Sequence, residues 1–144
     1  MNYTCRFSLL LLSGVSLTSC LQEELPTPTN LAQTNNVIYL QNVVTKTENA
    51  VTKFNNLIKQ GNVIVDFYAD WCGPCKGMST VIGQLAPQYP NVTFLKINTD
   101  MFPAISSNIR SIPTIVFYKN GQQVHRQSGA LTASQMSSLI QKLF

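Results

Sequence analysis

Charge, histidine and long apolar runs are all scarce in this sequence of 144 residues. Only 11% of the residues are charged, against roughly 25% in average proteins. The lysines and arginines form no cluster or stripe, so we expect no nucleic-acid partner despite the net charge of +4. The apolar segment from Phe7 to Leu17 falls well short of the roughly 20 residues that a membrane-spanning helix needs.

Cysteine and histidine are too few for most metal sites. The pair Cys72 and Cys75 could bind a metal together or close a small disulfide ring, but zinc usually takes four protein ligands. No second Cys-x-x-Cys is present, and the single histidine, His125, is remote in the sequence and is predicted to be a solvated surface residue. Covalent haem attachment would need a histidine where Lys76 stands. We therefore expect no metal and no cofactor.

The first 20 residues have the pattern of a bacterial lipoprotein signal. Arg6 precedes the apolar core, which ends in Leu17-Thr18-Ser19-Cys20, and this resembles a lipobox whose cysteine becomes lipidated and N-terminal. We predict a signal peptide over 1–19, and the lipidated Cys20 with a flexible, proline-containing tether over 20–36. The alternatives are plain secretion with cleavage after Ser16 and an uncleaved anchor. The lipoprotein prediction places the protein outside the cytoplasm as a membrane-anchored bacterial lipoprotein, on the periplasmic face of the inner or outer membrane.

Residues 37–144 are predicted to form one domain in which strands and helices alternate. Two capping boxes, Thr45 with Glu48 and Thr132 with Gln135, should each open a helix. In the first of these helices, the side chains expected to face the interior are those of Val51, Phe54, Leu57 and Ile58. Strands are expected over 37–41, 63–69, 92–97, 114–118 and 122–127, with a short helix or irregular turn over 102–108. This order predicts an α/β fold with three α/β/α layers and a central mixed β-sheet.

The cysteine pair lies where a buried strand ends and a helix begins. The apolar run from Val63 to Ala69 precedes it, and apolar residues at helical spacing follow it up to about Pro87. Unpaired backbone N–H groups and the positive end of the helix dipole favour a thiolate there. A stable thiolate is what thiol–disulfide exchange requires.

The element order and several separate motifs resemble the thioredoxin family over about 37–144. The matching pieces are Val65-Asp66-Phe67, Trp71-Cys72-Gly73-Pro74-Cys75-Lys76, Ile112-Pro113-Thr114, Lys119-Asn120-Gly121 and Gly129. The resemblance implies a thioredoxin fold and a Cys72–Cys75 redox-active disulfide, with Cys72 at the exposed helix start as nucleophile and Cys75 as the deeper, resolving cysteine. Gly73-Pro74 between the cysteines accompanies a reducing role in the family.

Asp66 is an acid within an otherwise apolar strand. Burial should raise its pKa, which would suit it to move a proton at neutral pH. In the family this position accepts the proton of the resolving cysteine, and Lys96 matches a lysine that approaches the acid. Alternatively, Asp66 points outward at a strand end and Lys96 lies at the surface.

The remaining site residues are predicted by the resemblance to bind substrate. A cis Ile112–Pro113 bond would present the backbone of Ile112 to an extended substrate strand. Trp71, Gly129 and Ala130 would form an apolar rim around Cys72, where a partner docks. Gly73 and Pro74 are also predicted to bind substrate.

These predictions indicate a monomeric protein-disulfide reductase outside the cytoplasm. Its partners would be protein disulfide substrates, an electron-donating membrane thiol reductase, and the membrane itself through the lipid on Cys20. A thiol oxidase or disulfide isomerase is an alternative that an oxidising compartment supports and Gly73-Pro74 opposes. A non-catalytic binding module with this fold is another alternative, although such modules commonly lose a cysteine.

Overall fold

The computed structural model describes residues 36–144, so the predicted signal peptide, Cys20 and all but the last residue of the predicted tether lie outside the described residues. None of the helices in this part is long and apolar enough to cross a membrane. The elements are β1 (Val37–Tyr39), α1 (Leu40–Val43), α2 (Ala50–Ile58), β2 (Asn62–Tyr68), α3 (Gly73–Leu85), the 3-10 turn η1 (Ala86–Gln88), β3 (Val92–Asn98), α4 (Pro103–Ser106), β4 (Thr114–Lys119), β5 (Gln122–Ser128) and α5 (Ala133–Leu143).

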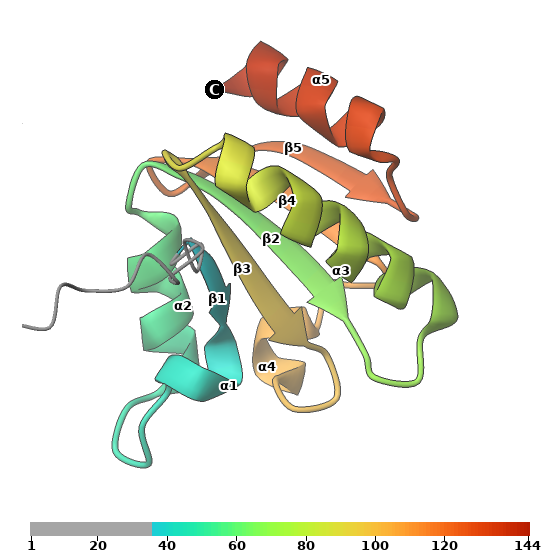
Figure 1. The fold of residues 1–144 in the computed structure, drawn as a ribbon. Helices are drawn as coiled ribbons and strands as arrows, with labels where there is room; N and C mark the ends of the chain where they lie inside the picture. Colours follow the sequence, from blue (N-terminus) through green and yellow to red (C-terminus); the bar gives the residue numbers. More distant parts are fainter. Residues whose placement is uncertain (1–35) are drawn as a thin grey trace, which may run out of the picture. The chain divides into compact units, whose positions relative to one another are not determined.

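A five-stranded mixed sheet with the order β1-β3-β2-β4-β5 forms the centre of the domain (Figure 1). β3 pairs in parallel with both β1 and β2, whereas β4 runs antiparallel to β2 and β5 antiparallel to β4. Asn120 and Gly121 join the last two strands with φ angles of 51° and 85°, as a tight hairpin turn requires. The predicted mixed sheet and hairpin are confirmed.

Helices cover both faces of this sheet, because the side chains of each strand alternate between two apolar clusters. α3 and α5 cover one face (Figure 1), where Ile64 and Phe94 pack against residues of these helices. On the other face, Val65 and Leu95 pack against residues of α1 and α2 and the region of α4. Asp66 is two residues beyond Ile64 in β2, so the alternation places it on the α3 face.

The two predicted capping boxes have different outcomes. Thr132 and Gln135 form a complete box at the start of α5. The prediction for Thr45 and Glu48 is wrong, because α2 begins after Asn49, whose side chain accepts a hydrogen bond of 2.8 Å from the backbone N–H of Val51. Asparagine caps a helix as well as threonine does, and Glu48 instead pairs with Lys53 at 3.5 Å.

Three smaller predictions also need correction. Val51 is 37% exposed, so it does not face the interior. The first strand ends at Tyr39, and Leu40, which is wholly buried, already belongs to α1. His125 is half-buried, with its ring edge against Phe117 at 5.5 Å between centroids. It pairs with Phe117 in the β4–β5 ladder and shares its face of the sheet, which is why it is not fully solvated.

Asn36 fixes the start of the described chain to the domain. Its amide nitrogen donates to the backbone carbonyls of Ala86, Tyr89 and Val92 at 2.9–3.1 Å. Its own carbonyl accepts from the backbone N–H of Phe94 at 2.7 Å. The ordered domain therefore includes the residue that the sequence places at the end of the tether.

Candidate active site

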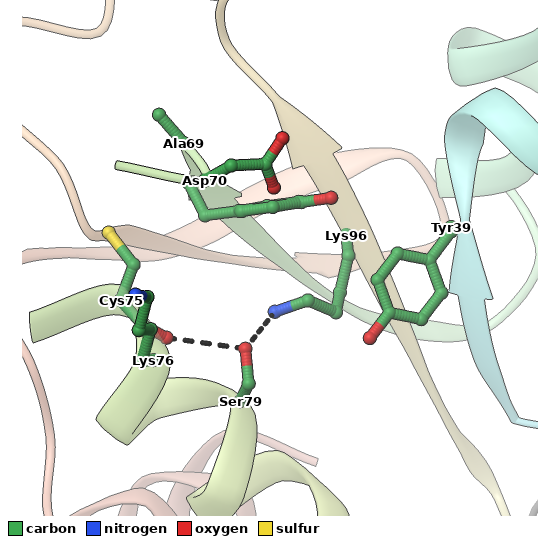
Figure 2. Close-up of a pocket in the computed structure, with 8 residues that line it drawn as sticks. Tyr39, Ala69, Asp70, Cys75, Lys76, Ser79 and Lys96 are labelled. Carbon is green, nitrogen blue, oxygen red and sulfur yellow. Dashed lines mark hydrogen bonds between the residues drawn. The ribbon is translucent and has the colours of Figure 1, made fainter. Parts of the chain in front are cut away.

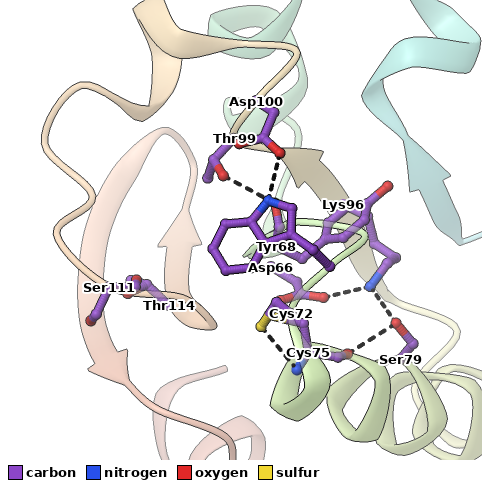
Figure 3. Close-up of a disulfide and its surroundings, with 11 residues drawn as sticks. Asp66, Tyr68, Cys72, Cys75, Ser79, Lys96, Thr99, Asp100, Ser111 and Thr114 are labelled. Atoms are coloured by element: carbon purple, nitrogen blue, oxygen red, sulfur yellow. Dashed lines mark hydrogen bonds and ion pairs between the residues drawn. A yellow bond between two sulfur atoms is a disulfide. The ribbon is translucent and has the colours of Figure 1, made fainter.

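Cys72 and Cys75 form a disulfide at the junction of β2 and α3. Cys72 is the N-cap residue of α3, and its sulfur accepts a hydrogen bond of 3.2 Å from the backbone N–H of Cys75 (Figure 3). Backbone N–H groups at a helix start favour a thiolate at this sulfur once the disulfide is reduced. Within residues 36–144, no three Cys, His, Asp or Glu side chains lie together as a metal site would require.

Both cysteines are buried, with 4% of Cys72 and 2% of Cys75 exposed. The prediction that Cys72 is exposed is therefore wrong, although the residues around it at the start of α3 are exposed. Gly73 and Pro74 are exposed, and Trp71 is 72% exposed. The Trp71 indole is held by a hydrogen bond of 2.9 Å from Nε1 to Oδ2 of Asp100, which fixes an apolar surface beside a recessed disulfide.

The loop before β4 forms the opposite side of the site. The Ile112–Pro113 peptide bond is cis, and Ile112 packs against the apolar cluster that contains both cysteines. The backbone N–H of Gly129 donates to the carbonyl of Pro113 at 2.8 Å, and exposed Ala130 follows it. The structure therefore brings Gly129 to the Ile112–Pro113 loop, although β4 and β5 separate them in sequence.

An open groove of about 410 Å³ lies between Trp71 and this loop. Its lining residues are Trp71, Thr99, Ile109, Arg110, Ser111 and Ile112. Among the hydrogen bonds of the described turns and loops, none involves the backbone of Ile112. A strand laid along the groove could therefore bond to it.

Asp66 and Lys96 form a buried ion pair behind the disulfide (Figure 3). Each is 1% exposed, and Nζ of Lys96 lies 2.5 Å from Oδ2 of Asp66. Burial raises the pKa of Asp66, and the nearby charge and hydrogen bond of Lys96 only partly oppose this effect. The second carboxylate oxygen, Oδ1, is buried and has no hydrogen-bond partner. The alternatives with Asp66 pointing outward and Lys96 at the surface are therefore wrong.

Three residues that contact Lys96 were not predicted as site residues from the sequence. Ser79 accepts a hydrogen bond of 2.9 Å from Nζ, while the ring centroids of Tyr68 and Tyr39 lie 4.6 Å and 5.8 Å from Nζ, within cation–π range. The sequence does contain signals for two of them. Tyr68 follows Asp66 by two residues and so shares its face of β2, and Ser79 follows Cys75 by one helical turn.

A cavity of about 220 Å³ lies between Lys96 of this ion pair and Cys75 (Figure 2). Cys75, Ser79 and Lys96 contribute to its wall, whereas Asp66 does not, and reaches the cavity through Lys96. Its wall is mixed, with polar groups from Ser79 and Lys96, and its volume is large enough for water. The cavity therefore offers a route for protons between Cys75 and the buried pair.

Comparison with known proteins assigns the chain to a family. The thioredoxin family model matches residues 42–142. Thioredoxin of Chlamydia trachomatis is 40% identical over 87 residues, covering 59% of this chain and 85% of the relative. The chloroplast thioredoxin M-type of Spinacia oleracea is 46% identical over 83 residues, covering 56% of this chain but only 46% of the relative.

Solved structures agree with this assignment. The oxidised mitochondrial thioredoxin 3 of Saccharomyces cerevisiae has a TM-score of 0.60 and 38% identity, covering 65% of this chain and 90% of its own. A thioredoxin mutant from Halobacterium salinarum has a TM-score of 0.63 and 29% identity, and the match covers 78% of this chain and 95% of that one. The chain belongs to the thioredoxin family. Its domain is a thiol–disulfide oxidoreductase with the Cys72–Cys75 pair as its redox centre.

Proposed function

We propose that the protein reduces disulfides of other proteins outside the cytoplasm while tethered to a membrane through lipid on Cys20. The observation that carries the reducing activity is the recessed Cys72–Cys75 disulfide beside exposed Trp71 and an open groove. A small, open, partly apolar surface of this kind suits the backbone and side chains of a protein substrate. The tether and the location rest on the sequence pattern before residue 21.

The first step is an attack by Cys72 on one sulfur of the substrate disulfide. The Cys72 thiolate forms a mixed disulfide with that sulfur, and the other substrate sulfur leaves as a thiolate that takes up a proton. The extended substrate segment lies in the groove and pairs with the free backbone of Ile112, with Trp71 on one side and the Gly129-Ala130 turn on the other.

Cys75 then resolves the mixed disulfide. Its thiol gives a proton to Asp66 through the cavity, and the resulting thiolate attacks the sulfur of Cys72. The bond between Cys72 and the substrate breaks, and the second substrate sulfur leaves as a thiolate and is protonated. The substrate has gained two electrons and two protons, while Cys72 and Cys75 have become a disulfide. A thiol reductase in the membrane must then return two electrons to the pair.

Trapping of partners tests this division of roles. Cys75→Ser leaves the mixed disulfide on Cys72 without a resolving thiol, so covalent adducts with partner proteins should accumulate. Cys72→Ser should trap far fewer, and the double variant serves as the background control. Non-reducing gels and mass spectrometry of the adducts would identify the substrates. Equal trapping by the two single variants would contradict the assignment of nucleophile and resolving cysteine.

A further inference from the structure

Ser79 joins the helix that carries Cys75 to the buried ion pair. It lies on α3 one turn after Cys75, and its hydroxyl donates to the carbonyl of Cys75 at 3.2 Å. The same oxygen accepts a hydrogen bond of 2.9 Å from Nζ of Lys96 (Figure 2). A serine hydroxyl has one donor and two lone pairs, so both bonds form together.

The ammonium of Lys96 is therefore shared between two acceptors. It donates to Oδ2 of Asp66 and to Oγ of Ser79, while Oδ1 of Asp66 remains buried without a partner. We propose that Ser79 is a positioning residue that holds Lys96 on one carboxylate oxygen of Asp66 and keeps the other free for the proton of Cys75. This role rests on the resolving step proposed above.

Removal of the hydroxyl should redirect one ammonium donor. An ammonium group has three N–H donors. Without the Ser79 hydroxyl, the N–H group of Lys96 that now donates to Ser79 can turn to Oδ1 of Asp66. A carboxylate held through both oxygens binds a proton less well, because hydrogen bonds to the charged form lower its pKa. The titratable or charged side chains that line the adjoining cavity are Tyr39, Tyr68, Asp70, Cys75, Lys76 and Lys96. None of them is altered by a substitution at Ser79.

The chain offers a matched control in the next residue. Thr80 donates from its hydroxyl to the carbonyl of Lys76 at 3.4 Å, which is the same helical contact that Ser79 makes with Cys75. Its side chain is exposed and has no bond to Lys96. Thr80→Ala therefore removes a comparable backbone contact, whereas Ser79→Ala also removes the contact with Lys96. Ser79→Thr restores the hydroxyl.

The two halves of the exchange can be separated with one equivalent of the aromatic disulfide dithiobis(nitrobenzoate). Attack by Cys72 releases one coloured thiolate, and resolution by Cys75 releases the second. For Ser79→Ala we expect an unchanged first phase and a second phase slowed about 5–10-fold, on the order of the net contribution of one ordinary hydrogen bond. The pH midpoint of the second phase should move to lower pH. Ser79→Thr should restore both the rate and the midpoint.

A double-variant cycle tests whether Ser79 acts through Lys96. In a Lys96→Met background, Ser79→Ala should slow the second phase no further, because the bond that it removes is already absent. Equal second phases for Ser79→Ala and Thr80→Ala would overturn the role of Ser79 while leaving thiol exchange intact. A wild-type protein that releases only one thiolate would instead overturn the resolving step itself, and the role of Ser79 with it.

Discussion

Asp66→Asn is the substitution that tests the electrostatics of the site most sharply. Burial keeps the pKa of Asp66 above its ordinary value of 3.8 even with Lys96 beside it, so the ionised carboxylate is on balance unfavourable in the folded protein. Asparagine keeps the shape and an acceptor oxygen but carries no charge. We therefore expect the free energy of unfolding at pH 7 to rise by about 1–3 kcal/mol.

The opposing effect is the loss of a charged partner for Lys96. Breaking a buried ion pair costs about 3–5 kcal/mol when the remaining charge has no compensation. Here Lys96 keeps the hydroxyl of Ser79 at 2.9 Å and the face of Tyr68 at 4.6 Å, and the asparagine oxygen can still accept. The pKa of Asp66 is raised even though Lys96 attracts its carboxylate. We therefore expect the stability gained by removing the buried charge to exceed the stability lost with the ion pair.

Proton linkage gives the sign of the pH dependence. The folded pKa lies above the unfolded one, so between these two values the folded protein binds more protons than the unfolded chain. The stability contributed by Asp66 is fully present below the unfolded pKa and is lost as the pH rises through the folded pKa. The loss is at most about 1.4 kcal/mol per pH unit. Asp66→Asn has no carboxylate at this position and does not lose this stability. The difference in unfolding free energy between Asp66→Asn and wild type should therefore grow as the pH rises from the unfolded to the folded pKa, and should vanish below the unfolded pKa.

Urea unfolding of the oxidised proteins at a series of pH values measures this difference, because bonded cysteines do not titrate. Lys96→Met removes the positive charge that lowers the pKa of Asp66. In this variant the pH-dependent loss of stability caused by ionisation of Asp66 should therefore continue to a higher pH than in wild type. Glu48→Gln removes a partly exposed carboxylate outside the site, where it pairs with Lys53, and should change stability by no more than about 0.5 kcal/mol. An Asp66→Asn variant that is less stable than wild type at every pH would refute the reasoning.

Three further substitutions have separate expected outcomes. Cys20→Ala should release the protein from the membrane fraction or block its processing, and an unmodified mature N-terminus elsewhere, found by mass spectrometry, would contradict the lipid anchor. Asn49→Ala should lower the unfolding free energy by about 1 kcal/mol, because it removes the N-cap of α2; an unchanged urea midpoint would show that the cap contributes nothing. Trp71→Ala should leave stability within about 0.5 kcal/mol, since the side chain is 72% exposed, yet raise KM for a protein disulfide and not for a small aromatic disulfide.

The sequence predicts the strands well because their signals are local. The Val63–Ala69 run and the Asn120-Gly121 turn carry their structure in a few adjacent residues, and β2 and the hairpin form almost where they are predicted. The start of α2 was predicted wrongly because two polar residues compete for the cap. Thr45 fits the three-residue spacing of a box, but Asn49 lies next to the helix that forms.

The candidate site was predictable where a residue type is unusual in its context. An acid within an apolar strand marked Asp66, and two cysteines at a strand–helix junction marked the redox pair. Ser79 and Tyr68 carry ordinary residue types, and their roles depend on where Lys96 extends from β3. Side-chain direction across neighbouring elements is a tertiary property, and no local pattern encodes it.

The reduction potential of the Cys72–Cys75 pair tests the proposed function most directly. Equilibration of the purified domain with defined ratios of oxidised and reduced dithiothreitol or glutathione, followed by alkylation and mass spectrometry, gives the fraction of disulfide at each potential. A reductase with Gly73-Pro74 between its cysteines should lie near the value of thioredoxin, about −270 mV. A potential of about −180 to −120 mV, where disulfide isomerases and strong oxidases lie, would contradict the reducing role and favour thiol oxidation or isomerisation.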